Sequence, residues 1–181
     1  SRAKTVNIST PEISGLSNIE KAFERSDKRY YNIPCPSSTC GKLITLEWEI
    51  DLGKEKAGLF WKTDGVGRII ESSVEYICQC CGNGFKEGEK YEMNLAGVWV
   101  PTVKEPKEKL HRGYTINALY PVGMRSWSKL ITHYMKAYPG AGIKDEGIEQ
   151  TFYNLVLAKP YVKSNDEMKV TDLMANNRRP Y

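Results

Sequence analysis

The chain has 181 residues, of which 40% are hydrophobic and 27% are charged, a composition typical of a globular protein with a buried core. No apolar run approaches the roughly 18 residues needed to span a bilayer, and the first residues lack the apolar centre of a signal peptide, so we expect a cytoplasmic protein with no membrane partner. A formal net charge of +4 favours an anionic partner such as nucleic acid.

The N-terminal part of the sequence predicts a strand, a helix and a second strand. Residues 4–9 are β-prone, and Pro11 ends the run because proline cannot continue a central strand. Ser17, with a glutamate three residues later, forms a capping box and predicts a helix over about 17–27. Residues 30–33 then read as a strand that leads into the first cysteine of the chain.

Four cysteines form two close pairs, and each pair is followed by glycine: Cys35 with Cys40, and Cys78 with Cys81. Zn²⁺ takes about four tetrahedral ligands and binds thiolates at roughly 2.3 Å, so the two pairs predict a structural zinc ribbon. Disulfides and unrelated free thiols are the alternatives. The odd total of five cysteines and the absence of a signal peptide argue against a secreted disulfide framework. Cys80 lies inside the second pair and is left as a spare.

Strand-like segments flank the cysteine pairs. Residues 43–50 alternate apolar and polar side chains, and residues 73–78 lead into the second pair. A glycine-rich loop with a short hairpin near 59–61 is predicted to project between them. A short helix over 87–95 and a strand over 97–101 follow the second pair.

A lysine-rich loop follows and contains the candidate nucleic-acid contacts. Its basic side chains, together with two arginines of the tail, either contact phosphate or form a solvated face; they are Lys104, Lys107, Lys109, Arg112, Arg178 and Arg179. Glu105 and Glu108 interrupt the basic run. His111 and His133 lie outside both cysteine pairs and are read as a loop residue and a helix-face residue.

The C-terminal third predicts a strand-like segment over 113–119 and two helices. Ser126 is the expected N-cap of the first helix, which carries an apolar stripe. A second helix with Phe152 on its buried face is predicted to end near Lys159 and Pro160. The remaining polar residues resemble a linker.

Four blocks occur in an order that resembles the large terminase subunit of tailed phages, of the lambda-like type: residues 7–36, the two cysteine pairs, residues 113–130 and residues 150–161. The similarity extends over nearly all of residues 5–161. It implies part of a motor that hydrolyses ATP to pump double-stranded DNA into a procapsid, joined to a nuclease that cuts the concatemer. The small terminase subunit and the portal are the implied protein partners, and the host cytoplasm is the implied location.

The same resemblance implies that Ser9 and Thr10 belong to the motor's coupling motif, which relays the state of the γ-phosphate. A strand end with favourable turn residues is the simpler alternative. No GxxxxGK[ST] loop and no pair of acidic residues after an apolar strand occurs, so ATP and Mg²⁺ are expected only in the full-length family protein. We expect this chain alone neither to hydrolyse ATP nor to cut DNA.

The sequence thus predicts an α+β fold, comprising a piece of a P-loop-type α/β ATPase domain with an inserted β-rich zinc ribbon and C-terminal helices. The predicted segments are 1–33 (end of the ATPase core), 34–102 (zinc ribbon), 103–160 (helical remainder) and 161–181 (linker toward a nuclease). Two features depart from the family pattern: the first cysteine pair encloses four residues instead of two, and LAKP replaces LGEP. The alternative function is an autonomous zinc-ribbon module that binds nucleic acid or docks onto a partner.

Overall fold

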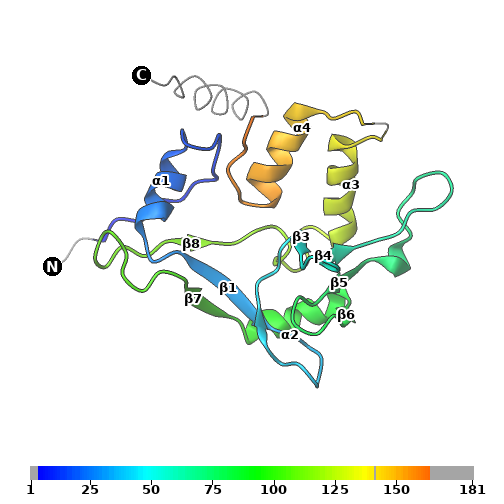
Figure 1. Ribbon diagram of the computed structural model, residues 1–181, viewed down its shortest axis with the longest axis horizontal. Coiled ribbons are helices and arrows are strands. Elements are labelled where there is room, and N and C mark those ends of the chain that lie inside the picture. Colours follow the sequence, from blue (N-terminus) through cyan, green and yellow to red (C-terminus); the bar gives the residue numbers. More distant parts are fainter. Residues whose placement is uncertain (1–3, 141, 164–181) are drawn as a thin grey trace, which may run out of the picture.

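The computed structural model describes residues 4–140 and 142–163, and its mixture of helices and strands confirms the α+β class (Figure 1). The helices are α1 (Asn18–Arg25), α2 (Lys90–Leu95), α3 (Trp127–Ala137) and α4 (Glu146–Thr151), with the 3₁₀ turns η1 (Glu71–Ser73) and η2 (Glu87–Glu89) and the π-helical turn η3 (Phe152–Val156). The strands are β1 (Arg29–Pro34), β2 (Leu43–Ile44), β3 (Glu49–Asp51), β4 (Lys56–Phe60), β5 (Glu75–Ile77), β6 (Gly84–Phe85), β7 (Val98–Pro101) and β8 (Tyr114–Thr115). No helix within these ranges is long and apolar enough to cross a membrane.

The first sheet is built around β1. Strands β2 and β7 pair with β1 antiparallel, and β8 pairs with it in parallel. In this register Tyr31 lies opposite Trp99, and Arg29 lies opposite both Pro101 and Tyr114. Residues directly opposite each other point to the same face of a sheet, so the sheet collects aromatic side chains from three strands on one face.

The second sheet has the antiparallel order β3-β4-β5-β6 and lies within residues 34–102, the segment predicted as a zinc ribbon and called the ribbon below. Gly58 in β4 has a φ of +107°, and a Cβ atom there would lie 2.6 Å from the carbonyl oxygen of Trp48. Only glycine fits this close approach between neighbouring strands. The segment between β4 and β5 extends away from the sheet, as the sequence predicts (Figure 1). The hairpin predicted near 59–61 is wrong, because Leu59 and Phe60 belong to β4 and pair with β5, and the projecting segment is closed instead by a bridge between Thr63 and Ile69.

The ribbon and the C-terminal helices share one hydrophobic cluster. Cys35 and Cys78 belong to it together with Trp127 of α3 and Phe152 of η3. The ring of Trp48, which precedes β3, lies 4.8 Å from the Phe152 ring, measured between centroids. The ribbon is therefore packed directly on the helical unit, and a change of side-chain volume in one part strains the packing of the other.

A partly buried ion pair strengthens this junction. Lys90 is only 1% exposed, and its ammonium group lies 3.0 Å from the Glu87 carboxylate and 5.3 Å from the centre of the Trp127 ring. The other oxygen of Glu87 accepts from the amide of Trp127 at 2.9 Å. Ser126 caps the same helix as predicted, because its hydroxyl accepts from the amide of Lys129. The Glu87 contact fixes the N-terminus of α3 against the segment before α2, and the Ser126 cap satisfies an amide within α3 itself.

The predicted N-terminal strand is wrong. Residues 4–9 form no strand, because this segment meets no strand partner within the described residues, and Val6 and Ile8 are 77% and 92% exposed. The following helix is confirmed as α1, with Ser17 at its N-cap. The capping box is wrong, since the Ser17 side chain makes no cap bond and Glu20 instead accepts from the Ser14 hydroxyl and the Gly15 amide at 3.1 and 2.8 Å.

The predicted strand over 43–50 is divided into β2 and β3. Two backbone amides between these strands are held by tyrosine hydroxyls: that of Leu46 by Tyr120 at 2.7 Å, and that of Glu47 by Tyr76 at 3.0 Å. A chain whose amides bond to side chains leaves the strand ladder at that point.

Most remaining elements are confirmed, with small differences in their bounds. Strand β1 extends one residue beyond each end of the strand predicted over 30–33, whereas the strands predicted over 73–78, 97–101 and 113–119 contain the shorter β5, β7 and β8. The helix predicted over 87–95 is divided into η2 and α2. The last helix ends at Val156, a few residues before the predicted end near Lys159. Most of the predicted tail linker, residues 164–181, lies outside the described residues.

Candidate metal centre

The two cysteine pairs have the same backbone arrangement. The amide of Cys35 donates to the carbonyl of Lys42 at 2.9 Å, and the amide of Cys78 donates to the carbonyl of Asn83 at 3.0 Å. In both pairs the acceptor follows a glycine with positive φ, +55° at Gly41 and +72° at Gly82. The left-handed glycine turns the chain back, so that both cysteines of a pair face the same point.

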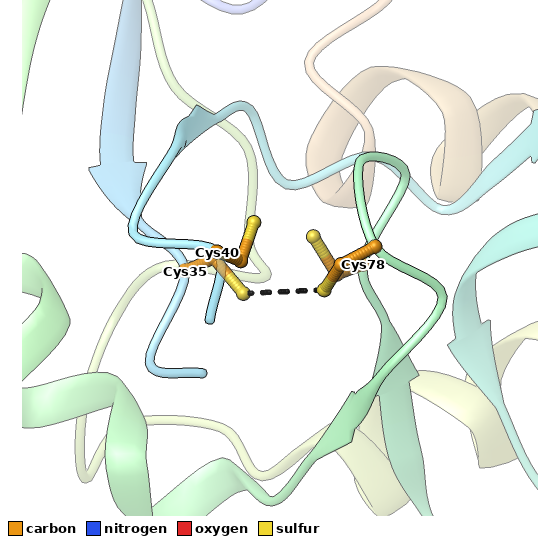
Figure 2. A group of neighbouring side chains, drawn as sticks. Cys35, Cys40 and Cys78 are labelled. Atoms are coloured by element: carbon orange, nitrogen blue, oxygen red, sulfur yellow. Dashed lines mark hydrogen bonds between the residues drawn. The ribbon is translucent and has the colours of Figure 1, made fainter. Parts of the chain in front are cut away.

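The four sulfur atoms of Cys35, Cys40, Cys78 and Cys81 all lie within 4.8 Å of one another, and those of Cys35 and Cys81 are 3.9 Å apart. Figure 2 shows the side chains of Cys35 and Cys40 facing Cys78 across the gap between the two loops. A tetrahedral zinc ion with metal–sulfur bonds of about 2.3 Å has sulfur–sulfur edges of about 3.8 Å. The cluster can therefore hold a metal ion with little movement of the ligands.

The centre is partly built into the core. Cys35 and Cys78 are 4% and 0% exposed, whereas Cys40 is partly exposed and Cys81 is exposed. Burial raises the pKa of the Cys35 thiol, with a smaller contribution from Cys78 nearby. A bound cation would favour the thiolate at this position, because metal coordination deprotonates a thiol outright. Four protein ligands leave no open position for water, which is the pattern of structural sites.

Two further contacts stabilise the loops around the sulfurs. The side-chain amide of Asn83 donates to the Ser37 hydroxyl at 3.0 Å and so joins the two pairs. The amide of Cys80 lies 3.4 Å from the Cys78 sulfur and donates to it. Sequence reasoning did not single out Ser37 or Asn83, and the only signal was their place next to the cysteines. Amide donors of this kind orient metal-binding thiolates.

The other candidate ligands stay outside the centre. Cys80 is exposed and does not belong to the sulfur group, which agrees with its reading as a spare. His111 pairs with the Glu108 carboxylate at 2.9 Å, and His133 lies edge-on against the Phe152 ring. Burial, followed by the charges of Arg125 and Lys136, lowers the pKa of His133.

Ser9 and Thr10 lie in the exposed segment before α1, and the Ser9 hydroxyl donates to the Thr10 carbonyl at 3.1 Å. Thr10, Pro11 and Glu12 form one wall of a shallow pocket, and α4 and η3 form the other. Just beyond the pocket, the Ser14 amide donates to the carbonyl of Tyr161 at 2.9 Å. The segment after Thr10 is thus bound to the C-terminal end of the described chain.

The loop between β7 and β8 presents its basic residues to solvent. Lys104, Lys107, Lys109 and Arg112 are all exposed, and none forms an ion pair with another described residue. Glu108, by contrast, pairs with Arg25 at 3.1 Å and with His111. The loop therefore carries more free positive than free negative charge. Arg178 and Arg179 lie outside the described residues.

Comparison with known proteins gives two family matches. Residues 1–99 match the family described as phage terminase large subunit gpA, ATPase domain. Residues 111–181 match the family described as terminase large subunit gpA, endonuclease domain. No curated protein and no solved structure matches the chain. The residues between the two matched ranges, 100–110, comprise the end of β7 and most of the basic loop that joins β7 to β8.

Proposed function

Because the chain belongs to the gpA family of phage terminase large subunits, we propose that it works in the packaging of phage DNA, with a structural zinc ion in the four-cysteine centre and a basic surface that contacts double-stranded DNA. In the resemblance described above, the full-length subunit supplies ATP-driven translocation and cleavage of the concatemer. The role proposed for this chain is to hold DNA and to transmit movement of the coupling motif. Its residues do this through their position and their charge.

The observation that carries the metal proposal is the mutual distance of the four sulfurs, all within 4.8 Å. Thiolate ligands in a tetrahedral arrangement select zinc or iron–sulfur chemistry over magnesium or calcium. Zinc suits a site whose ligands come from two short loops. Its filled d shell imposes no preferred geometry, so four suitably placed donors are sufficient. Since two of the ligands lie in the shared core, the ion would stabilise the ribbon and its junction with α3 together.

Free positive charge on the loop of residues 104–112 supports the DNA proposal. Binding through phosphate alone is independent of sequence and sensitive to salt, because each lysine or arginine that contacts a phosphate releases a counterion. With a net charge of +4, the chain neutralises few phosphates, and weak binding follows. Instead of DNA, the ribbon could bind one of two proteins, the small terminase subunit or the portal, and these are the alternative partners.

We keep Ser9 and Thr10 as the proposed coupling motif. Support comes from the chain that follows them: Ile13 forms a β-bridge with Tyr161, whose hydroxyl donates to the buried carboxylate of Glu149 at 2.7 Å. A displacement of Thr10 would reach α4 through this contact. The division into 1–33, 34–102, 103–160 and 161–181 likewise remains a proposal.

One titration tests the DNA contact. Labelled duplex DNA is titrated at two salt concentrations with the unaltered chain and with a variant in which Lys104, Lys107, Lys109 and Arg112 are alanine. We expect the variant to bind more weakly and to show a smaller salt dependence, because fewer counterions are released. A control variant with alanine at the exposed lysines Lys21 and Lys54 removes charge away from the loop. Unchanged affinity of the loop variant would exclude this surface.

A further inference from the structure

One face of the first sheet carries an aromatic row that extends over three strands. The ring of Trp99 in β7 lies 5.0 Å from that of Tyr31 in β1 and 5.1 Å from that of Tyr114 in β8. The guanidinium carbon of Arg29 lies 5.7 Å from the centre of the Tyr114 ring. We name these four residues the aromatic row. Their common face follows from the register, in which Arg29 opposes Tyr114 and Tyr31 opposes Trp99.

The row is anchored at one end and open at the other. Tyr31 packs against the buried ring of Tyr120, and its hydroxyl donates to the carbonyl of Asn94 at 2.6 Å. Trp99 is partly exposed, and Tyr114 is 50% exposed, while Ile116 just beyond β8 is 47% exposed. Rigid rings with a free surface can stack against a planar ligand at little entropic cost.

The surroundings of the row are basic. The loop that carries Lys104, Lys107, Lys109 and Arg112 leaves the end of β7 and enters β8, so it borders the row at its Arg29 end (Figure 1). Of the two glutamates in this loop, Glu108 is already paired with Arg25 and His111. Asp27, the acidic neighbour of Arg29, forms an ion pair with it at 2.8 Å. Glu105 is the remaining acidic residue of the loop, and against four unpaired basic side chains it leaves the charge beside the row positive in sum.

We propose that the aromatic row is a binding site for unpaired nucleotides of single-stranded nucleic acid. Exposed aromatic rings bordered by positive charge are the two parts that such sites combine, the rings for the bases and the cations for the phosphates. A duplex offers its phosphates but not its base faces, since these are stacked on one another. The row therefore distinguishes single strands from duplex, whereas the loop alone does not. This inference rests on the proposed function only for its ligand class, nucleic acid.

Tyr114 provides the sharpest test, because it lies at the open end of the row. A labelled oligothymidine of about 16 nucleotides, which has little structure of its own, and a duplex of the same length are titrated with each variant. We expect the unaltered chain to bind the oligothymidine more tightly than the duplex. Tyr114→Ala should lose about 5- to 150-fold in affinity for the oligothymidine, the range measured for one stacked base, and should bind duplex as before. Tyr114→Phe should retain the affinity, since the ring and not the hydroxyl stacks.

Tyr91→Ala is the matched control, because Tyr91 is 55% exposed on α2 and lies outside the row. It should leave both affinities unchanged, and thermal unfolding of each variant checks that the fold is kept. Equal losses in Tyr114→Ala and Tyr91→Ala, or equal affinity of the unaltered chain for single strand and duplex, would overturn the proposal. The proposed phosphate contacts are tested separately by the variant in which the four basic loop residues are alanine. If this variant binds both the oligothymidine and the duplex like the unaltered chain, the phosphate contacts are wrong while the aromatic row is still tested by Tyr114→Ala.

Discussion

The side-chain amide of Asn83 donates to the hydroxyl of Ser37 at 3.0 Å, and this bond links the two cysteine pairs outside the sulfur cluster. The two loops come from parts of the chain more than forty residues apart, and the bond adds a direct polar link to the packing of Cys35 and Cys78 in the shared core. Preorganised ligand loops bind a metal more tightly, because less ordering is required on binding. The bond therefore belongs to the metal centre although neither residue is a ligand.

We expect Asn83→Ala to lose zinc faster to a competing chelator, with an affinity up to about tenfold lower, as is typical for residues that support metal ligands. Ser38→Ala is the control, because Ser38 is an exposed serine of the same loop and does not bond to Asn83. A colorimetric chelator measures release from both variants. Identical release rates would show that the Ser37–Asn83 bond adds nothing to the site.

The ligand set predicts a sharp difference between two neighbouring cysteines. We expect one zinc ion per chain, lost in Cys78→Ser and kept in Cys80→Ser, because the Cys78 sulfur lies in the cluster whereas Cys80 is exposed and outside it. Elemental analysis of the purified proteins gives the stoichiometry. The reverse pattern, with zinc lost only in Cys80→Ser, would reject the assigned ligands.

Loss of Gly58 should destabilise the ribbon. In Gly58→Ala the new methyl group would lie 2.6 Å from the Trp48 carbonyl oxygen, in a backbone conformation with φ of +107° that alanine avoids. We expect a loss of about 1–3 kcal/mol in the free energy of unfolding, the cost of strain of this kind. Gly65→Ala is the control, because a Cβ there meets nothing within 4 Å and φ is not positive. Urea unfolding of both variants makes the comparison.

Local signals in the sequence were sufficient for the cysteine pairs, the N-cap of α3 and the family, but not for the capping box predicted at Ser17. The Cys-Gly ends of both pairs predicted the turns that converge on one point, and Ser126 predicted the start of α3 correctly. The ordered motifs predicted the terminase large-subunit family, which the two family matches confirm. The cysteine and cap signals lie within a few residues of the features that they predict, whereas the family signal depends on the order of blocks along the chain.

Long-range contacts could not be predicted in the same way. The split of residues 43–50 depends on hydroxyls of Tyr76 and Tyr120, which lie 29 and 74 residues away in the sequence. The aromatic row depends on the pairing of β1 with both β7 and β8, and no periodicity within one strand reveals it. Strand period shows which residues share a face of one strand, but not which strands become neighbours.

Glu149 joins several segments of the C-terminal part of the described chain. From its contacts we expect a specific dependence of the free energy of unfolding on pH. Its carboxylate is buried and accepts from the hydroxyls of Tyr138 and Tyr161, and it pairs with Lys144 at 2.9 Å. Burial alone would raise the pKa of Glu149, but the donors outweigh it and hold that pKa below its usual value. A lowered pKa means that the ionised carboxylate stabilises the folded state.

The stabilisation is complete above the pKa of the unfolded chain, about 4.3, and is lost as the pH falls through the lower folded value. We expect Glu149→Gln to reduce the free energy of unfolding by about 1–3 kcal/mol near pH 7, the range for hydrogen bonds to a charged group. The difference from the unaltered chain should begin to shrink as the pH falls below the pKa of the unfolded chain and should continue to shrink as the pH falls through the lowered folded pKa. Glu105→Gln, at an exposed loop position, should show no such pH-dependent difference. Urea unfolding of the three proteins between pH 7 and pH 3 measures these differences in the free energy of unfolding. A difference for Glu149→Gln that stays constant down to pH 3 would mean that packing rather than charge accounts for the role of Glu149.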